Sequence, residues 1–141
     1  KSYLPTGFSL GRDSYKQRFS EMMGGHVPAD KMEKYFAAQS IWDDTMAFQV
    51  VKTIQKMPKG SVLMVVVGEF HTQYGGGFPD RLKQRLITLD RLQNGIGYDD
   101  VQIKTLSFLD QQGMDLETKN QQNWPSEKWG ARADYLWLIN D

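Results

Sequence analysis

Cysteine is absent from this sequence of 141 residues, so neither a disulfide nor a thiolate metal site can form. An excess of one charge is also absent, because 17 basic residues balance 17 acidic ones. The net charge therefore gives no reason to expect a nucleic acid or a charged membrane surface as partner. The longest apolar run, residues 62–67, is far shorter than the roughly 20 residues that cross a bilayer.

Helical and strand-like segments alternate along the chain, which is typical of an α/β fold. Helices are predicted over residues 12–23, 28–57 and 79–93, and strands over residues 61–68, 101–109 and 133–139. The first strand is continuously apolar, as expected for a central parallel strand covered by helices on both faces. The polar residues 110–130 are expected to form an irregular excursion at one edge of the sheet. We therefore predict a three-layer α/β/α fold with a mainly parallel sheet, of which this chain supplies about three strands and three helices.

The predicted sheet is thin for a free-standing domain. Strands that alternate with helices usually belong to a sheet of about five or six strands. At this length there is little reason to expect a second domain. Residues 1–141 are therefore predicted to form a single domain that is part of a larger α/β domain.

Two polar residues interrupt the apolar stripe of the long predicted helix. Gln39 and Asp43 fall in the middle of a buried face whose other members are Met32, Phe36, Met46, Val50, Ile54 and Met57. Burying an amide and a carboxylate costs several kcal/mol unless each finds a partner. Either the two residues hydrogen-bond to a neighbouring loop and lock the packing, or they reach a site at the end of the sheet.

Three side chains capable of acid–base or ligand chemistry follow the apolar run. Glu69, His71 and Tyr74 lie where the first strand should end, and ligands of open α/β sheets bind outside the carboxyl ends of strands. In an extended backbone Glu69 and His71 point to the same side. A histidine at this place can be a metal ligand, a general base or a structural donor. A tyrosine can serve as an axial ligand of ferric haem.

Three consecutive glycines, Gly75 to Gly77, follow the tyrosine. They remove side chains where something flat or bulky could approach the backbone, although a plain flexible turn explains them equally well. The helix predicted to begin after them offers amides that favour an anion, with Arg81 or Arg85 adding charge.

Together these motifs resemble the ChaN-like haem-binding lipoproteins, relatives of the wider Tiki, TraB and erythromycin-esterase group. The resemblance is carried by Ala38-Gln39, Trp42-Asp43, Met46-Ala47, Gly68-Glu69-Phe70-His71, Tyr74-Gly75, Gly77, Pro79, Arg81-Leu82 and Ala133-Asp134-Tyr135. Family members normally begin with another strand that ends in a Gly-Glu-x-His type motif, and that block has no counterpart here. The resemblance therefore implies that residues 1–141 are the C-terminal part of a larger ChaN-like domain.

The family resemblance implies a function as well as a fold. It implies an iron-regulated bacterial lipoprotein that binds haem, faces the periplasm and is held at the cell envelope by a lipid anchor absent from this sequence. It also implies a homodimer that haem can bridge. A tyrosine ligates the iron in that family, and Tyr74 lies in the matching motif, with His71 and the tyrosines Tyr3, Tyr15 and Tyr35 as alternatives. The residues expected to bind the cofactor are Gln39, Asp43, Glu69, His71, Tyr74, Gly75, Gly77 and Arg81.

Two other functions stay open. A metal-dependent hydrolase related to Tiki-type proteases or erythromycin esterases would use Glu69 and His71 to bind a divalent metal or to activate water. Alternatively, the glycine loop and exposed aromatic residues could serve a protein partner. That last hypothesis ranks lowest, because it gives Gln39 and Asp43 no reason to lie on the buried stripe. We therefore expect haem binding without catalysis, and no nucleic-acid partner.

Overall fold

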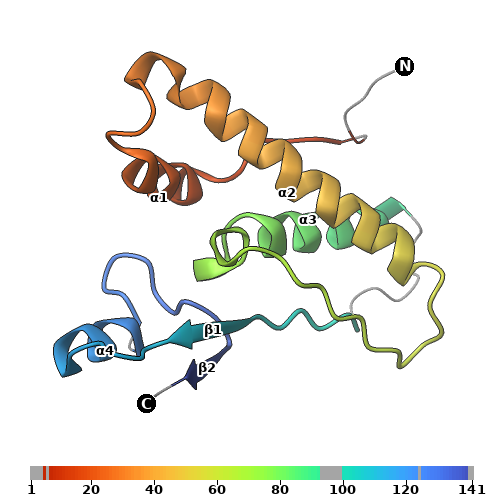
Figure 1. Ribbon diagram of the computed structural model, residues 1–141. Coiled ribbons are helices and arrows are strands. Elements are labelled where there is room, and N and C mark those ends of the chain that lie inside the picture. The colour runs from red at the N-terminus through yellow and green to blue at the C-terminus, as the bar shows by residue number, and fades with distance from the viewer. Residues whose placement is uncertain (1–4, 6, 93–99, 124, 140–141) are drawn as a thin grey trace.

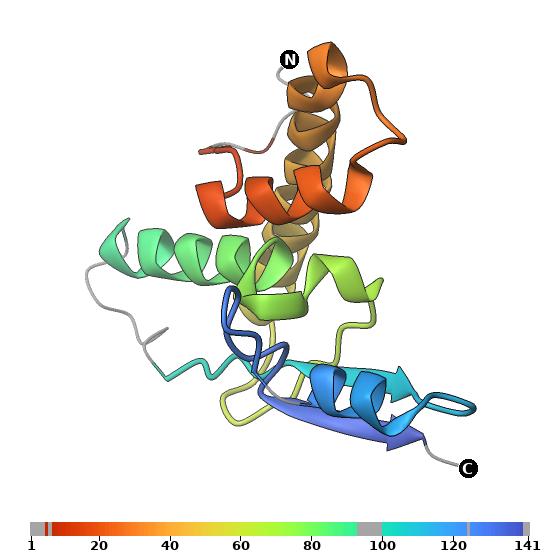
Figure 2. The ribbon, with the colours of Figure 1, turned by 90° about the vertical axis from the view of Figure 1, so that its left-hand side faces the viewer.

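The computed structural model describes residues 5, 7–92, 100–123 and 125–139 (Figure 1). Its elements, in chain order, are α1 (Asp13–Met23), a 3-10 turn (Ala29–Lys31), α2 (Met32–Ile54), two further 3-10 turns (Glu69–His71 and Gln73–Gly75), α3 (Phe78–Leu92), β1 (Leu106–Asp110), α4 (Leu116–Asn123) and β2 (Tyr135–Ile139). Helices α1, α2 and α3 lie together on one side, with the two strands and α4 on the other (Figures 1 and 2). The predicted α/β class is confirmed.

The two strands form a parallel pair, as predicted. Leu106 pairs with Tyr135 at the start of the ladder, and Asp110 pairs with Ile139 at its end. Hydrogen bonds also join the residues that directly precede the two strands: the Thr105 amide and hydroxyl both donate to Asp134 Oδ2, at 2.8 and 2.9 Å. The hydrogen bond from the Thr105 backbone holds the pKa of Asp134 below its usual range. Both strands are shorter than predicted, because the strand pairing begins only after Thr105 and Asp134.

The strand predicted over residues 61–68 is not formed within the described part of the chain. Residues 61–68 have no assigned secondary structure, and the backbone of residues 62–67 makes no hydrogen bond to another described residue. Their side chains alternate, since Val62, Met64 and Val66 are 90%, 83% and 88% exposed, whereas Leu63 and Val65 are 38% and 39% exposed. A strand requires a hydrogen-bonded neighbour as well as an apolar sequence, and the described residues supply none.

The region predicted to be wholly irregular contains the helix α4, so that prediction was wrong. Asp115 caps this helix, accepting from the Thr118 amide at 2.8 Å and from the Thr118 hydroxyl at 2.9 Å. The helix lacks an apolar face, because Leu116 is its one large aliphatic residue and is 74% exposed. Hydrophobic periodicity could not reveal it, although the spacing of Asp115 and Thr118 was a usable signal.

Two apolar clusters hold the helices α1, α2 and α3 against one another. The larger cluster joins α2 to α3 and consists of Ala47, Val50, Val51, Phe78, Leu82 and Leu86. The smaller one joins α1 to α2 through Tyr15, Phe19 and Phe36, with Phe70 packed against it. Phe70 lies in the first 3-10 turn after the extended segment, so the second cluster holds that turn against the helices and positions His71. No helix in the described ranges is both long and apolar enough to cross a membrane.

Candidate functional site

A buried hydrogen-bond network joins α1 and α2 to the turn that contains His71. His71 Nδ1 lies 2.6 Å from Asp43 Oδ1 and 3.0 Å from Gln39 Nε2. The Tyr15 hydroxyl donates to Asp43 Oδ2 at 2.8 Å and accepts from Gln39 Nε2 at 2.9 Å. Asp43 is fully buried, and the His71 side chain is 17% exposed. Gln39 and Asp43 on α2 thus contact the turn that follows the apolar run, and both the packing role and the role in binding a cofactor stay open.

The network determines which ring nitrogen of His71 carries a proton. An ionised carboxylate can only accept hydrogen bonds, so the Asp43 contact calls for a proton on Nδ1. The Gln39 amide nitrogen, which can only donate, then bonds to the Tyr15 hydroxyl and not to Nδ1. In the neutral ring this tautomer leaves Nε2 with a free lone pair. Histidines that ligate a metal almost always donate their other ring nitrogen to a carboxylate, a carbonyl or water in this way. His71 is therefore oriented to offer Nε2 to a metal ion.

Burial governs the ionisation of the other members of the network. It raises the pKa of Asp43, against which the hydrogen bonds from His71 and Tyr15 act. Burial also raises the pKa of Tyr15, and the nearby Asp43 carboxylate adds to that rise. Tyr15 is 2% exposed and stays a neutral phenol, so its hydroxyl is a structural donor rather than an iron ligand. Of the other tyrosines considered, Tyr35 is 49% exposed on α2, and Tyr3 lies outside the described residues.

His71 lines an open hollow of about 430 Å³. The hollow is completed by Trp42, Thr45, Met46, Val66, Val67 and Gly68. The Trp42 indole stacks beside the imidazole, with ring centroids 6.3 Å apart and planes inclined by 29°, and it is 66% exposed. A flat aromatic wall, aliphatic side chains and a histidine nitrogen suit a planar apolar ligand that carries a metal. The volume falls within the range of about 300–1,000 Å³ found for small-molecule sites.

Glu69 does not accompany His71, which corrects the expectation that both point to one side. Residues Glu69–His71 form a 3-10 turn, in which side chains two positions apart diverge, instead of an extended strand. The Glu69 carboxylate accepts from Arg132 Nη1 at 2.9 Å. Within the described ranges, no three His, Asp or Glu side chains gather in a way that could hold a metal ion.

Tyr74 lies among arginines rather than in the His71 network. Its ring is faced by the guanidinium groups of Arg18 and Arg132, at 5.1 and 5.8 Å from the ring centroid. Its backbone has φ 57° and ψ 27°, a left-handed conformation that is rare for an aromatic residue. Ligation of the haem iron by Tyr74 stays a prediction.

The glycines after Tyr74 make room for a side chain of the protein itself. A Cβ on Gly77 would come within 2.7 Å of the His71 carbonyl and 2.9 Å of the Tyr15 hydroxyl. A Cβ on Gly76 would meet the Tyr15 ring at 3.0 Å. Gly75 is more open, since its Cβ would lie 3.7 Å from an Arg12 nitrogen. The flat group against this backbone is therefore Tyr15, and these glycines support the network by admitting its ring.

The two arginines expected to attract an anion are already engaged. Arg81 is buried, donates to Ser9 Oγ and to the Leu10 carbonyl, and pairs with Asp80 at 2.5 Å. Arg85 forms a bidentate ion pair with buried Asp44. An anion at the start of α3 would have to compete with these partners. A role of Arg81 in cofactor binding stays a prediction.

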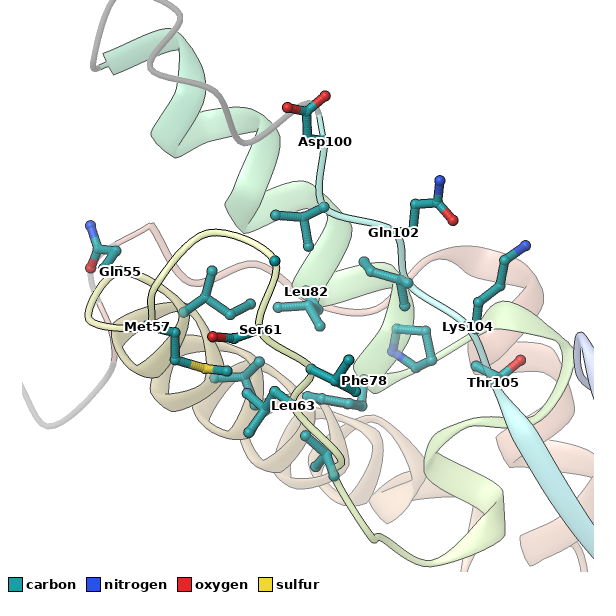
Figure 3. Close-up of a pocket in the computed structure, with 18 of the residues that line it drawn as sticks. Gln55, Met57, Ser61, Leu63, Phe78, Leu82, Asp100, Gln102, Lys104 and Thr105 are labelled. Carbon is teal, nitrogen blue, oxygen red and sulfur yellow. The ribbon is translucent and has the colours of Figure 1, made fainter.

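A larger cavity of about 920 Å³ shares no lining residue with the hollow beside His71 (Figure 3). It opens between residues 58–65 and residues 100–106, with Phe78 and Leu82 of α3 lining it. Figure 3 shows Leu63 and Phe78 directed into the same space, with residues 100–106 along the opposite side. Lys59 and Asp100 form an ion pair of 3.4 Å at the point where both segments begin. The cavity therefore separates two extended segments that start at the same end.

The structure brings Arg18 and Arg132 close to the candidate site, and neither was predicted; Tyr15 was named only as an alternative iron ligand, not as part of a hydrogen-bond network. All three meet the turns at Glu69–His71 and Gln73–Gly75. Tyr15 had a signal, because it lies four residues before Phe19 on the buried face of the first predicted helix. The arginines had none, because an isolated arginine in a sequence is usually a surface residue.

Comparison with known families gives one match. The family of haem-binding uptake proteins of the Tiki superfamily, ChaN, matches residues 1–82, which include α1, α2, the network and the glycine loop. Neither a curated protein nor a solved structure showed significant similarity to the chain. Because the matched residues make up more than half of the 141, the chain belongs to the ChaN family of haem-binding uptake proteins.

Proposed function

We propose that this protein binds haem through His71, with Nε2 as the iron ligand, in the hollow beside Trp42. The observation that carries the proposal is the pairing of His71 Nδ1 with the buried Asp43 carboxylate at 2.6 Å. That hydrogen bond fixes the tautomer and makes Nε2 a better donor to a metal. Histidine is an established axial ligand of haem iron.

The residues around His71 fit the group. Trp42 can lie against the porphyrin face, and Met46, Val66 and Val67 supply aliphatic contacts. Bound haem would supply redox and ligand-binding chemistry at its iron. The protein would bind and orient the group, and the buried network would keep a proton on His71 Nδ1.

A titration of the protein with hemin tests this function. We expect a Soret band that saturates at one haem per chain and a bound haem that survives gel filtration. Asp43→Asn should weaken the binding, since an amide is a poorer acceptor for His71 Nδ1 than a carboxylate. A protein that leaves the hemin spectrum unchanged at equimolar concentration would rule the proposal out.

The hydrolase alternative is less well supported by the geometry. It requires Glu69 beside His71, whereas the Glu69 carboxylate is bound by Arg132. Metal analysis separates the two functions: stoichiometric zinc, cobalt or manganese in the purified protein, with no hemin uptake, would favour the hydrolase.

The cellular role belongs to the same proposal. Anchoring by lipid at the bacterial cell envelope, a periplasm-facing position, a part in iron or haem acquisition and a haem-bridged homodimer are what the family resemblance implies. Sedimentation of the protein with and without hemin tests the homodimer, which predicts a doubling of mass on hemin addition.

We also propose that residues 1–141 belong to a larger α/β domain, in which a further strand lies between residues 61–67 and 100–106. The unpaired backbone of residues 62–67 and the cavity of about 920 Å³ support this. Hydrogen exchange tests it: the amides of residues 62–67 should exchange quickly in residues 1–141 alone and slowly in a longer natural protein. Slow exchange in residues 1–141 alone would contradict it.

A further inference from the structure

Arg18 is a buried cation whose partners are all neutral. The residue is 8% exposed, and it donates to Gln73 Oε1 at 2.6 Å and to the Phe70 carbonyl at 3.0 Å. Its guanidinium lies 4.4 Å from the centroid of the Phe70 ring. Burial lowers the pKa of Arg18, because the charged form loses hydration that these partners only partly replace.

Two more arginines converge on the same turn. Arg132 has a side chain that is 19% exposed; it pairs with Glu69, and its buried Nε has no hydrogen-bond partner among the described residues. Arg12 is exposed and donates from Nη2 to the Tyr74 carbonyl at 2.9 Å. Arg12, Arg18 and Arg132 thus bring three guanidinium groups to a place where Glu69 supplies one carboxylate, which leaves an excess of positive charge.

Tyr74 is held at the centre of this cluster in a strained conformation. Its amide donates to the Arg132 carbonyl at 2.7 Å, and its carbonyl accepts from Arg12. These two bonds maintain the left-handed backbone, with φ 57°, that an aromatic residue rarely adopts. Strain of this kind persists where the surroundings over-determine it, and it concentrates at ligand sites.

We infer that Arg12, Arg18 and Arg132 form an anion site around Tyr74 that receives the carboxylates of the porphyrin side chains. This assignment rests on the proposed haem function. Guanidinium groups match carboxylates in geometry and charge, and they bind them more strongly than neutral donors do. The carbonyl bound by Arg18 belongs to Phe70, the residue directly before His71, so the cluster and the proposed iron ligand share one turn. Arg81 and Arg85 already have carboxylate partners and are poorer candidates.

The site can be tested with porphyrins that differ only in their carboxylates or their iron. Arg132→Gln and Arg12→Gln remove one cation each, and Lys128→Gln removes an exposed cation from the loop that precedes Arg132, where it pairs with Glu21. Binding is measured with hemin, with its dimethyl ester, which lacks free carboxylates, and with metal-free protoporphyrin IX, which His71 cannot ligate. Far-ultraviolet circular dichroism establishes that each variant is folded.

We expect Arg132→Gln to weaken the binding of hemin and of metal-free protoporphyrin IX by about tenfold or more and to leave the binding of the ester unchanged. The loss of affinity should be larger than the loss caused by Lys128→Gln. Arg12→Gln should show the same selectivity, and it keeps the test decisive if Arg132→Gln does not fold. Hemin binding that neither arginine substitution changes, or an equal loss for hemin and ester, overturns this site and leaves the haem proposal intact. A wild-type protein that binds no hemin overturns the haem proposal and this assignment with it.

Discussion

Replacing Asp43 by alanine probes the network at its centre. Asp43 accepts one hydrogen bond from Tyr15 and one from His71, and it is fully buried. Asp43→Ala leaves both donors without an acceptor in a site that water reaches poorly. An unsatisfied buried donor costs about 1–3 kcal/mol, so the two together cost about 2–6 kcal/mol.

Part of that loss is offset. Burial raises the pKa of Asp43, so the folded protein already bears a cost for keeping this carboxylate ionised, and alanine removes it. A net destabilisation of about 2–4 kcal/mol is therefore expected, a large fraction of the roughly 5–15 kcal/mol that stabilises a domain. Asp43→Asn keeps one acceptor and should lose about half as much.

Urea unfolding at pH 7, followed by circular dichroism, measures these losses as a shift of the midpoint at constant slope. Gln49→Ala, on the exposed face of the same helix, is the matched control and should change the free energy of unfolding by less than about 0.5 kcal/mol. If Asp43→Ala destabilises the protein no more than Gln49→Ala, the network neither holds the turn of His71 to α2 nor orients Nε2.

Two other features give predictions of stability. Gly77 and Gly113 both have left-handed backbones, with φ +60° and +69°, but a Cβ meets the His71 carbonyl and Tyr15 at Gly77 and nothing within 4 Å at Gly113. Gly77→Ala should therefore cost about 1–3 kcal/mol more than Gly113→Ala in urea unfolding, and equal losses would show that the close approach is unimportant. Asp134→Ala should cost about 1 kcal/mol at pH 7, a modest value because the side chain is 37% exposed. Because the folded-state pKa of Asp134 is depressed, Asp134 stabilises the folded protein fully at pH values above the ordinary pKa of about 3.9, and this stabilisation is lost as the pH falls through the folded-state pKa. If the mutant and the wild type differ in free energy of unfolding by the same amount at pH 7 and at pH 2, this expectation is wrong.

The candidate site was predictable where the sequence places polar side chains on a buried face, because burying them costs free energy unless they have polar partners. Gln39 and Asp43 lie on a stripe of otherwise apolar residues and so called for polar partners; Asp43 is fully buried, Gln39 is half-buried, and both contact His71. The partner His71 could be named from its place alone. The burial of Tyr15 could be predicted from its spacing to Phe19, but its contact with Asp43 and the position of Arg18 could not, because the sequence does not show that α1 packs against this turn.

The fold was predictable where local periodicity decides the outcome. The helices α1, α2 and α3 follow their apolar stripes closely, and a parallel sheet was expected from the alternation of helical and strand-like segments along the chain, although the helix between β1 and β2 was not predicted. Strand formation at residues 61–68 depends on a neighbour that local sequence cannot supply. The helix α4 has no apolar face, so its capping by Asp115 was the only local signal.

Ligation of the haem iron by His71 is tested most directly by the absorption spectrum of hemin bound to His71→Ala and Tyr74→Phe, beside wild type. We predict that Tyr74→Phe keeps the position of the Soret band, whereas His71→Ala shifts or abolishes it. A Soret band that is unchanged in His71→Ala and lost in Tyr74→Phe would contradict ligation by His71 and assign the iron to the tyrosine.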